Sequence, residues 1–351
     1  MTVKKIVHVV GTGTIGEPLI GLLTEHREQL GLDEVTFHKN SVSDRPKVKA
    51  LLRRGARLVA DQDKVHGFEA WGVEVAMLHD EALNRATVVI DCSPSGLKMK
   101  DSLYKHYEHN TKGFIAQGSE FGFGTMYARG INDDVLKKSG QYVQVVSCNT
   151  HNLSCIIDTL ALSEGKDNLV EASFVCMRRA NDISQIKDFC PAPQVGTHKD
   201  GKFGTHHAHD AYHLFQTRGL ELNLFSSAVK LPTQYMHSLW FDLRLKRPTT
   251  LESLKARIKA NDRIAITDKK DSNTVFSFGR DQGHFGRILN QTVIPLSTMT
   301  MPNPNRVVGF CFTPQDGNSL LSSVAAALHF THPKDFEQRL QVLKPYFFDE
   351  V

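Results

Sequence analysis

Hydrophobic residues in the first 150 positions form short runs, and the segments between several runs carry apolar residues at the spacing of one helix face. Runs of this length between turn residues are typical of buried strands. Strands that alternate with helices predict a parallel sheet covered on both faces. The predicted strands are 6–10, 34–39, 57–60, 87–91, 113–117 and 141–147, and the predicted helices follow 16 and span 48–54 and 102–109.

The pattern changes after residue 148. Long segments with strand periodicity follow a helical stretch, which predicts a second, α+β domain with a mostly antiparallel sheet. Thr249 and Glu252 have the spacing of a capping box ahead of a further helix. The irregular region 180–218 is expected to be a long functional loop. The predicted strands are 169–178, 220–229, 237–245 and 306–312, and the predicted helices are 152–162, 318–329 and 334–343.

The first predicted strand leads into Gly11-Thr-Gly13-Thr-Ile-Gly16, and a predicted helix begins there. Glycines at this spacing let the backbone approach a pyrophosphate, whose charge the helix N-terminus attracts. With a strand before it and a helix after it, the motif indicates dinucleotide binding rather than only a tight turn. The candidate cofactor-binding residues of this turn are Gly11, Gly13, Thr14, Ile15 and Gly16.

The predicted fold class is therefore α/β, with two domains and a terminal segment. Residues 1–147 are expected to form a Rossmann dinucleotide-binding domain with a parallel sheet. Residues 148–312 are expected to form the catalytic domain, and residues 313–351 a helical segment that returns to the Rossmann domain. A length of 351 residues supports two domains.

The second predicted strand ends in His38-Lys39-Asn40, where a carboxylate often binds the ribose 2′-hydroxyl of NAD. A cation tolerates or binds a 2′-phosphate instead, so Lys39 favours NADP over NAD; the alternative is a solvated surface lysine. Small residues follow two later strands, and they are either cofactor contacts or plain turns. These candidates are Ser93, Pro94 and Gly118.

A cysteine stands where predicted strand 141–147 ends, in the segment Ser147-Cys148-Asn149-Thr150. The N–H groups and dipole of a following helix lower the pKa of a thiol, and the thiolate is the nucleophile. We interpret Cys148 as that nucleophile. A nucleophile needs a base, and His237 is a candidate, although its spacing alone favours a core or surface histidine.

Two further groups of residues suit an anion. Arg178 and Arg179 end a predicted strand, and guanidinium forks match phosphate oxygens; a solvated charge pair is the alternative. The stretch 206–210, His-His-Ala-His-Asp, concentrates histidines. Phosphate or substrate contact, zinc ligation and a surface loop all remain open for it. No second ligand group follows at a recognisable spacing, so no metal is expected.

The composition and net charge limit the classes of binding partner that the sequence predicts. Hydrophobic residues make up 40% and charged residues 23% of the chain, as in ordinary globular proteins. A net charge of +4 without a dense basic tract does not favour nucleic acid. The apolar runs are too short for a membrane span, and the first residues lack the pattern of a signal peptide. The 6 cysteines are expected to be free thiols, with disulfides as the alternative.

Taken together, these segments resemble the archaeal-type (type II) glyceraldehyde-3-phosphate dehydrogenase family. The most specific match is 145–150, Val-Val-Ser-Cys-Asn-Thr, and the similarity continues in order along nearly the whole chain. The other matching segments are 89–94, 117–120, 178–179, 206–207, 210, 231–233, 236–237 and 279–283.

The resemblance implies a phosphorylating aldehyde dehydrogenase. Cys148 would attack the aldehyde, His237 would act as general base, and hydride would pass to NADP or NAD. Inorganic phosphate would then attack the thioester and give an acyl phosphate. The family also implies a cytoplasmic homotetramer and a cofactor contact at Gln282. The implied substrate and phosphate contacts are Asn149, Thr150, Arg178, Arg179, His206 and His207.

The chain departs from the family pattern beside these sites. The family's His-His-Gly-Pro-Asp is His206-His207-Ala208-His209-Asp210 here, and His151 replaces a small or hydroxyl residue. These changes leave open which aldehyde is the substrate. A related dehydrogenase or acyl-phosphate reductase for aspartate semialdehyde or erythrose 4-phosphate is one alternative. A catalytically idle dinucleotide-binding protein that senses redox state or binds RNA is the other.

Overall fold

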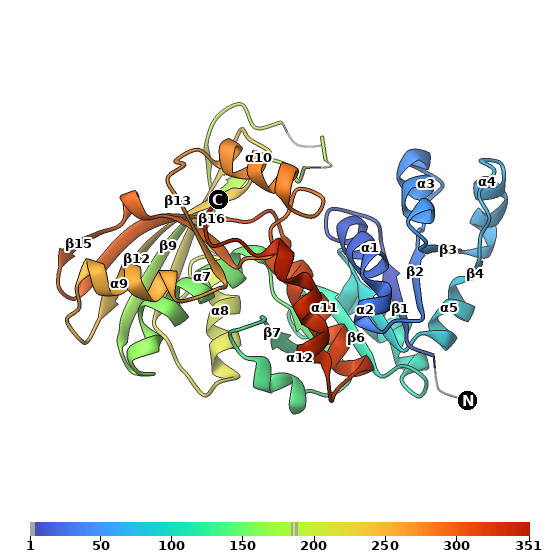
Figure 1. The fold of residues 1–351 in the computed structure, drawn as a ribbon, viewed down its shortest axis with the longest axis horizontal. Coiled ribbons are helices and arrows are strands. Elements are labelled where there is room, and N and C mark those ends of the chain that lie inside the picture. The colour runs from blue at the N-terminus through green and yellow to red at the C-terminus, as the bar shows by residue number, and fades with distance from the viewer. Residues whose placement is uncertain (1–3, 184, 187–188) are drawn as a thin grey trace. The chain divides into compact units, whose positions relative to one another are not determined.

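The computed structural model describes residues 4–183, 185–186 and 189–351, which form two compact units (Figure 1). The first three residues of predicted domain 1–147, and residues 184, 187 and 188 of predicted loop 180–218, lie outside the described residues. Unit 1 comprises Met1–Thr125, Asp134–Val145 and Ser322–Lys344. Unit 2 comprises Met126–Asp133, Val146–Leu321 and Pro345–Val351.

Unit 1 is built on a parallel sheet with the strand order β4-β3-β2-β1-β5-β6-β8-β7, where the pairings from β4 through β8 are parallel. All residues of β1, β2 and β6 are buried, which explains the nearly continuous apolar runs of β1 and β6; in β2, polar and apolar residues alternate. The strand order reverses between β1 and β5, where such sheets bind ligands. The strands are β1 Ile6–Val10, β2 Glu34–His38, β3 Arg57–Ala60, β4 Met77–Leu78, β5 Val88–Asp91, β6 Gly113–Gln117, β7 Thr125–Tyr127 and β8 Tyr142–Val145.

Short helices connect these strands. One prediction was shifted: residues 102–109 do not form one helix, because α6 ends at Ser102 and a 3-10 helix, Tyr104–Tyr107, follows. The Tyr104 hydroxyl donates to buried Asp91 at 2.6 Å, which fixes that turn against β5. The helices are α1 Gly16–Glu25, α2 Arg27–Leu30, α3 Arg45–Arg53, α4 Val65–Glu69, α5 His79–Arg85, α6 Gly96–Ser102, α11 Gly317–Thr331, of which Ser322 onward lies in unit 1, and α12 Phe336–Arg339.

Unit 2 contains a mixed sheet with the order β10-β11-β9-β12-β16-β14-β13, and β15 pairs with β16. The central strand β12 is antiparallel to both β9 and β16, whereas β11–β9 and β13–β14 are parallel pairs. Buried and partly exposed residues alternate along β12, so one face of the sheet covers the core. The strands are β9 Leu169–Arg179, β10 Gln194–Val195, β11 Leu224–Leu231, β12 His237–Leu245, β13 Ile264–Thr267, β14 Thr292–Pro295, β15 Thr300–Asn303 and β16 Arg306–Thr313.

A core of aliphatic and aromatic side chains joins this sheet to α7, α8 and α9. The predicted α/β fold class, with a parallel Rossmann sheet and a second, mostly antiparallel sheet, is therefore confirmed. In the described part of the chain, no helix has both the length and the apolar character to cross a membrane. The helices of unit 2 are α7 Cys148–Leu160, α8 His206–Gln216, α9 Leu251–Lys259 and α10 Ser272–Gln282, with the first turns of α11.

Three details of unit 2 differ from the sequence-based expectation. Region 180–218 is not one loop, because it includes β10 and all of α8. The residue that caps α9 is Thr250, whose side chain accepts from the Ser253 N–H, and not Thr249. The last residues, 345–351, belong to unit 2, since Val351 N donates to Ile266 O at 2.9 Å beside β13.

Candidate active site

The glycine turn of unit 1 joins β1 to α1 at the point where the strand order reverses. Gly11 has φ 93°, a left-handed conformation that favours glycine, and a Cβ built on it would lie 3.5 Å from the Cys92 backbone. A Cβ on Gly16 would lie 2.1 Å from the Gly11 carbonyl oxygen, so this position needs glycine for close packing. A Cβ on Gly13 would meet nothing within 4 Å. The turn thus holds open space at its middle glycine, as a pyrophosphate would require.

The remaining cofactor candidates of unit 1 lie at the same edge of the sheet. Thr14 and Ile15 are partly buried, and Ile15 precedes the first residue of α1. Ser93, after β5, donates its N–H to Asp91 at 2.7 Å, and Pro94 beside it is exposed. The other candidate, Gly118, follows β6 with φ 81°.

Lys39 lies directly after β2 and is buried, with its ammonium group 3.2 Å from the Ser43 hydroxyl. Burial lowers the pKa of Lys39, and the neighbouring Lys47 lowers it further. Lys47 was not singled out in the sequence; its ammonium group contacts Glu17 and Asp44 and donates to the Thr12 carbonyl of the glycine turn. Two cations therefore stand beside this turn.

Cys148 is the first residue of α7 and is half-buried. The Ser147 side chain caps this helix by accepting from the Thr150 N–H at 3.3 Å. Burial raises the pKa of the Cys148 thiol well above its usual range, and the carboxylate of Asp316 raises it further, whereas Arg179 lowers it. A thiol with a raised pKa keeps its proton at neutral pH, so this proton must leave before the sulfur can attack.

Arg179 and Asp316 form the charged surroundings of Cys148. The Arg179 guanidinium bonds to Asp182 at 2.8 Å and to Asp316 at 3.1 Å, and the Arg179 side chain is almost fully buried. Its Nη1 atom is buried and has no hydrogen-bond partner among the described residues. Arg179 therefore keeps one buried donor that a bound oxyanion can satisfy.

His237 begins β12 and is buried beside the same arginine. Its Nδ1 atom accepts the backbone N–H of Arg179 at 3.2 Å. Burial and the charges of Arg179 and Arg178 hold the pKa of His237 well below its usual range, so the ring is neutral. Since Nδ1 accepts, the neutral ring carries its proton on Nε2. Arg179 therefore contacts His237 through its backbone N–H, and the charge of its side chain lowers the pKa of Cys148.

The histidine stretch is not a loop: His206 is the first residue of α8. Its ring lies 4.0 Å from the ring of buried His207, whose Nε2 atom is 3.3 Å from the Asn149 amide nitrogen. A cavity of about 480 Å³ opens beside them. Its lining includes Arg178, Lys199, His206, His207 and His209, with one carboxylate, Asp200.

The other candidates of unit 2 have different surroundings. Asn149 is buried and accepts from the Thr313 hydroxyl at 2.9 Å, which ties the start of α7 to β16. The hydroxyl of Thr150 is 2.9 Å from the Ser147 hydroxyl, so it takes part in the helix cap. Gln282 is the last residue of α10 and is exposed.

Strained backbone surrounds this group of residues. Met236, Gln315 and Asp316 have φ values of 22°, 40° and 67°, which residues other than glycine rarely adopt. The Met236 N–H donates to the Gln315 side chain at 3.2 Å, and Asn318 donates to the Cys148 carbonyl at 3.0 Å. Strain of this kind concentrates at functional sites. The sequence analysis missed Asp316 and Asn318, and the turn residues Pro314–Gly317 were the only signal.

The glycine turn lies at the reversal point of a parallel sheet, which is the arrangement of a Rossmann-like, dinucleotide-binding fold. Comparison with known proteins leads to archaeal glyceraldehyde-3-phosphate dehydrogenases, which confirms the resemblance noted in the sequence.

The similarity is low but long. The chain is 27% identical over 292 residues to glyceraldehyde-3-phosphate dehydrogenase 2 of Methanosarcina barkeri, covering 80% of this chain and 79% of the relative. It is 25% identical over 303 residues to the Sulfolobus acidocaldarius enzyme, covering 83% and 82%. It is 25% identical over 281 residues to the Methanothermus fervidus enzyme, covering 77% and 76%. No family model matches the chain.

Proposed function

We propose that the protein is a phosphorylating glyceraldehyde-3-phosphate dehydrogenase that uses NADP or NAD. The observation that carries the proposal is the position of Cys148 at the start of α7. There, the charge of Asp316 raises the pKa of the Cys148 thiol and the charge of Arg179 lowers it. Arg178, which precedes Arg179 in the chain, lines a cavity together with Lys199 and three histidines. The long similarity to enzymes of that name supports the same reaction.

The cofactor proposal rests on the glycine turn and on Lys39. The space at Gly13 admits a pyrophosphate, and the N-terminus of α1 favours its charge. The Lys39 ammonium group donates a hydrogen bond to a serine hydroxyl, which is uncharged. Its positive charge can therefore pair with a 2′-phosphate, so we favour NADP. When bound, the nicotinamide supplies the hydride acceptor for aldehyde oxidation.

The chemistry of the chain itself begins with the Cys148 proton. Asp316 faces this thiol and raises its pKa, so attack on the aldehyde carbon requires transfer of the proton to a nearby group. The sulfur–carbon bond forms as that proton leaves, and the aldehyde oxygen gains negative charge. Arg179 Nη1 and the Nε2–H of His237 are the donors that we assign to that oxygen. To act as general base, His237 must first change tautomer, so that Nε2 is free to accept the Cys148 proton; the same Nε2–H then donates to that oxygen.

Loss of hydride converts the adduct on Cys148 into a thioester, which is activated toward attack by a phosphate oxygen. The cavity beside Arg178, His206 and His207 offers positive charge and donors for a phosphate group. Phosphate attack on the thioester carbon releases the Cys148 thiolate and an acyl phosphate. By the family resemblance we also propose a homotetramer, which light scattering on the purified protein would test.

A second candidate is a related dehydrogenase for another aldehyde. It is favoured by one observation: Asp182 and Asp316 together compensate the charge of Arg179, which leaves less positive charge for two phosphates. Both candidates use Cys148, and they differ in the substrate and in the need for inorganic phosphate.

The deciding experiment measures reduction of NADP and NAD with glyceraldehyde 3-phosphate, erythrose 4-phosphate and aspartate semialdehyde, each with and without inorganic phosphate. We expect glyceraldehyde 3-phosphate to be preferred, with turnover that depends on phosphate. Activity on aspartate semialdehyde alone would establish the second candidate. Absence of activity with all three aldehydes, in protein that binds NADP, would contradict both.

A further inference from the structure

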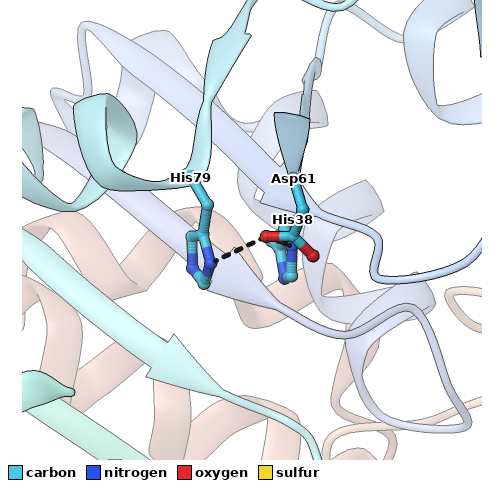
Figure 2. Close-up of side chains that lie close together, drawn as sticks. All are labelled: His38, Asp61 and His79. Atoms are coloured by element: carbon cyan, nitrogen blue, oxygen red, sulfur yellow. Dashed lines mark hydrogen bonds and ion pairs between the residues drawn. The ribbon is translucent and has the colours of Figure 1, made fainter. Parts of the chain in front are cut away.

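Three side chains from separate segments of unit 1 meet at one edge of its parallel sheet. His38 ends β2, Asp61 follows β3, and His79 begins α5 directly after β4. Because β2, β3 and β4 are parallel neighbours, their carboxyl ends lie at the same edge. Figure 2 shows both imidazole rings beside the Asp61 carboxylate.

The donor atoms of these residues converge. The Asp61 Oδ1 atom lies 3.2 Å from His38 Nε2 and 3.6 Å from His79 Nδ1, and all three donors lie within 4.8 Å of one another. The two rings stack at a centroid distance of 3.8 Å. Both histidines are buried, whereas 42% of the Asp61 side chain is exposed, which leaves an entry path on that side.

The electrostatic surroundings suit a cation. The charges of Asp80 and Asp91 act on His79 and His38, and both add negative potential to that of Asp61. Imidazole nitrogens together with a carboxylate are a ligand set that a divalent transition metal accepts.

Two buried imidazole nitrogens provide an independent observation. His79 Nε2 has no hydrogen-bond partner among the described residues, and neither does Nε2 of His8, which is fully buried. The ring centroids of His8 and His79 are 5.5 Å apart. A histidine that binds a metal through Nδ1 donates its Nε2–H to a neighbouring acceptor. We assign that acceptor role to His8 Nε2, which requires the two rings to adjust.

We propose that His38, Asp61 and His79 form a binding site for a divalent transition metal ion of the zinc class. Two imidazoles and a carboxylate are the three protein ligands of open zinc sites, in which water or another ligand takes the fourth position. Coordination requires the stacked rings to turn so that both lone pairs point at one ion. The ion would join the ends of β2, β3 and β4, whose residues are distant in sequence.

The site lies in unit 1 and Cys148 in unit 2, and the proposal does not depend on dehydrogenase activity. In the sequence a metal was considered only for the 206–210 stretch, and none was expected; His38, Asp61 and His79 come from three segments with no recognisable spacing. The His206–His209 stretch and the thiols are competing sites for zinc, so the experiment must show which residues bind.

The test titrates the metal-free, full-length protein with Zn²⁺ and with Co²⁺, following heat and visible absorption. We expect one tight site whose Co²⁺ spectrum is tetrahedral and lacks a thiolate charge-transfer band. Asp61→Asn, which changes a partly exposed side chain, and His79→Gln should each weaken binding at least about 100-fold. Unliganded variants should keep the circular dichroism of the parent.

The matched control is His66→Gln, since His66 also stands 3.1 Å from a carboxylate, that of Glu69, but on the exposed surface. This variant should bind Zn²⁺ like the parent. Three results would overturn the proposal: no tight site in the parent, equal affinity in Asp61→Asn and parent, or a Co²⁺ spectrum with thiolate bands.

Discussion

At the scale of single residues, the protonation of Cys148 depends on the carboxylate that faces it. Asp316 raises the pKa of this thiol through its charge and a hydrogen bond, whereas Asp182 acts through charge alone and more weakly. Asp316→Asn should therefore lower the pKa of Cys148, and iodoacetamide should alkylate it faster at neutral pH. The measurement is the alkylation rate against pH, followed by peptide mass spectrometry.

Asp182→Asn is the matched control, because both carboxylates bind the same guanidinium nitrogen of Arg179. It should shift the alkylation profile less than Asp316→Asn does. Equal profiles for Asp316→Asn and the parent would show that Asp316 does not control the thiol.

In the proposed mechanism, His237 accepts the Cys148 proton and donates a hydrogen bond to the aldehyde oxygen. His237→Asn retains an acceptor for the Arg179 N–H but removes the imidazole, so kcat should fall by about 10² to 10⁴-fold. Binding of NADP, measured by fluorescence, should stay within a few-fold of the parent. A variant with unimpaired kcat would remove His237 from the mechanism.

The candidate site residues that the sequence indicated are those that follow a strand or precede a helix. Gly11, Gly13, Gly16 and Cys148 stand at such junctions, where local pattern and chemistry coincide. Asp316 could not be found in this way, because its role depends on a turn that folds back onto α7 from far along the chain. The sequence also did not reveal the raised pKa of Cys148, because it depends on burial and on Asp316.

At the scale of elements, the turn between β1 and α1 separates a packing glycine from a ligand-contacting glycine. Gly16→Ala places a Cβ 2.1 Å from the Gly11 carbonyl oxygen, so unit 1 should lose about 1–3 kcal/mol of stability. Gly13→Ala meets no atom within 4 Å, so the protein should unfold like the parent. Its affinity for NADP should nevertheless fall, because the Cβ enters the space assigned to the pyrophosphate.

Thermal unfolding and NADP titration of both variants test this pair. If Gly13→Ala bound NADP as tightly as the parent, the glycine turn would not be the pyrophosphate site. An unchanged melting temperature for Gly16→Ala would contradict the packing argument.

Six strands of the unit 1 sheet were predicted closely, since buried parallel strands are rich in apolar residues, whereas the short strands β4 and β7 were not predicted. Prediction failed where tertiary contacts determine the element. Helix α8 begins in a stretch of histidines, and it is fixed by Thr205, whose hydroxyl lies 3.1 Å from His207 Nδ1 and 2.6 Å from the Ser226 hydroxyl. The 3-10 turn Tyr104–Tyr107 after α6 likewise depends on the Tyr104–Asp91 contact, which local periodicity does not reveal.

At the scale of the whole molecule, buried neutral histidines make stability depend on pH. Burial lowers the pKa of His151, which has no exposed surface, from 6.5 to about 4. The unfolded chain therefore binds the proton more strongly, and stability is lost as pH falls below 6.5 toward 4. Between pH 7 and pH 5 this one group should cost about 2 kcal/mol. His207 and His237 act in the same direction.

The chain has 2 tryptophans, Trp71 in unit 1 and Trp240 in unit 2. When Trp71 is replaced, tryptophan fluorescence therefore follows unit 2 alone. Urea unfolding of Trp71→Phe should give a lower free energy of unfolding at pH 5 than at pH 7. The difference between the two pH values should be smaller when His151→Gln is added. Equal stability at the two pH values would contradict the neutral, buried state of these histidines.

The central claim is that Cys148 carries the acyl group during aldehyde oxidation. The most direct measurement mixes the protein with glyceraldehyde 3-phosphate and NADP without inorganic phosphate, quenches in acid, and locates the acyl adduct by peptide mass spectrometry. We predict one burst of NADPH per active site and an adduct on the peptide containing Cys148, both absent in Cys148→Ser, which should still bind NADP. A full burst without an adduct on Cys148, or an undiminished burst in Cys148→Ser, would contradict the account.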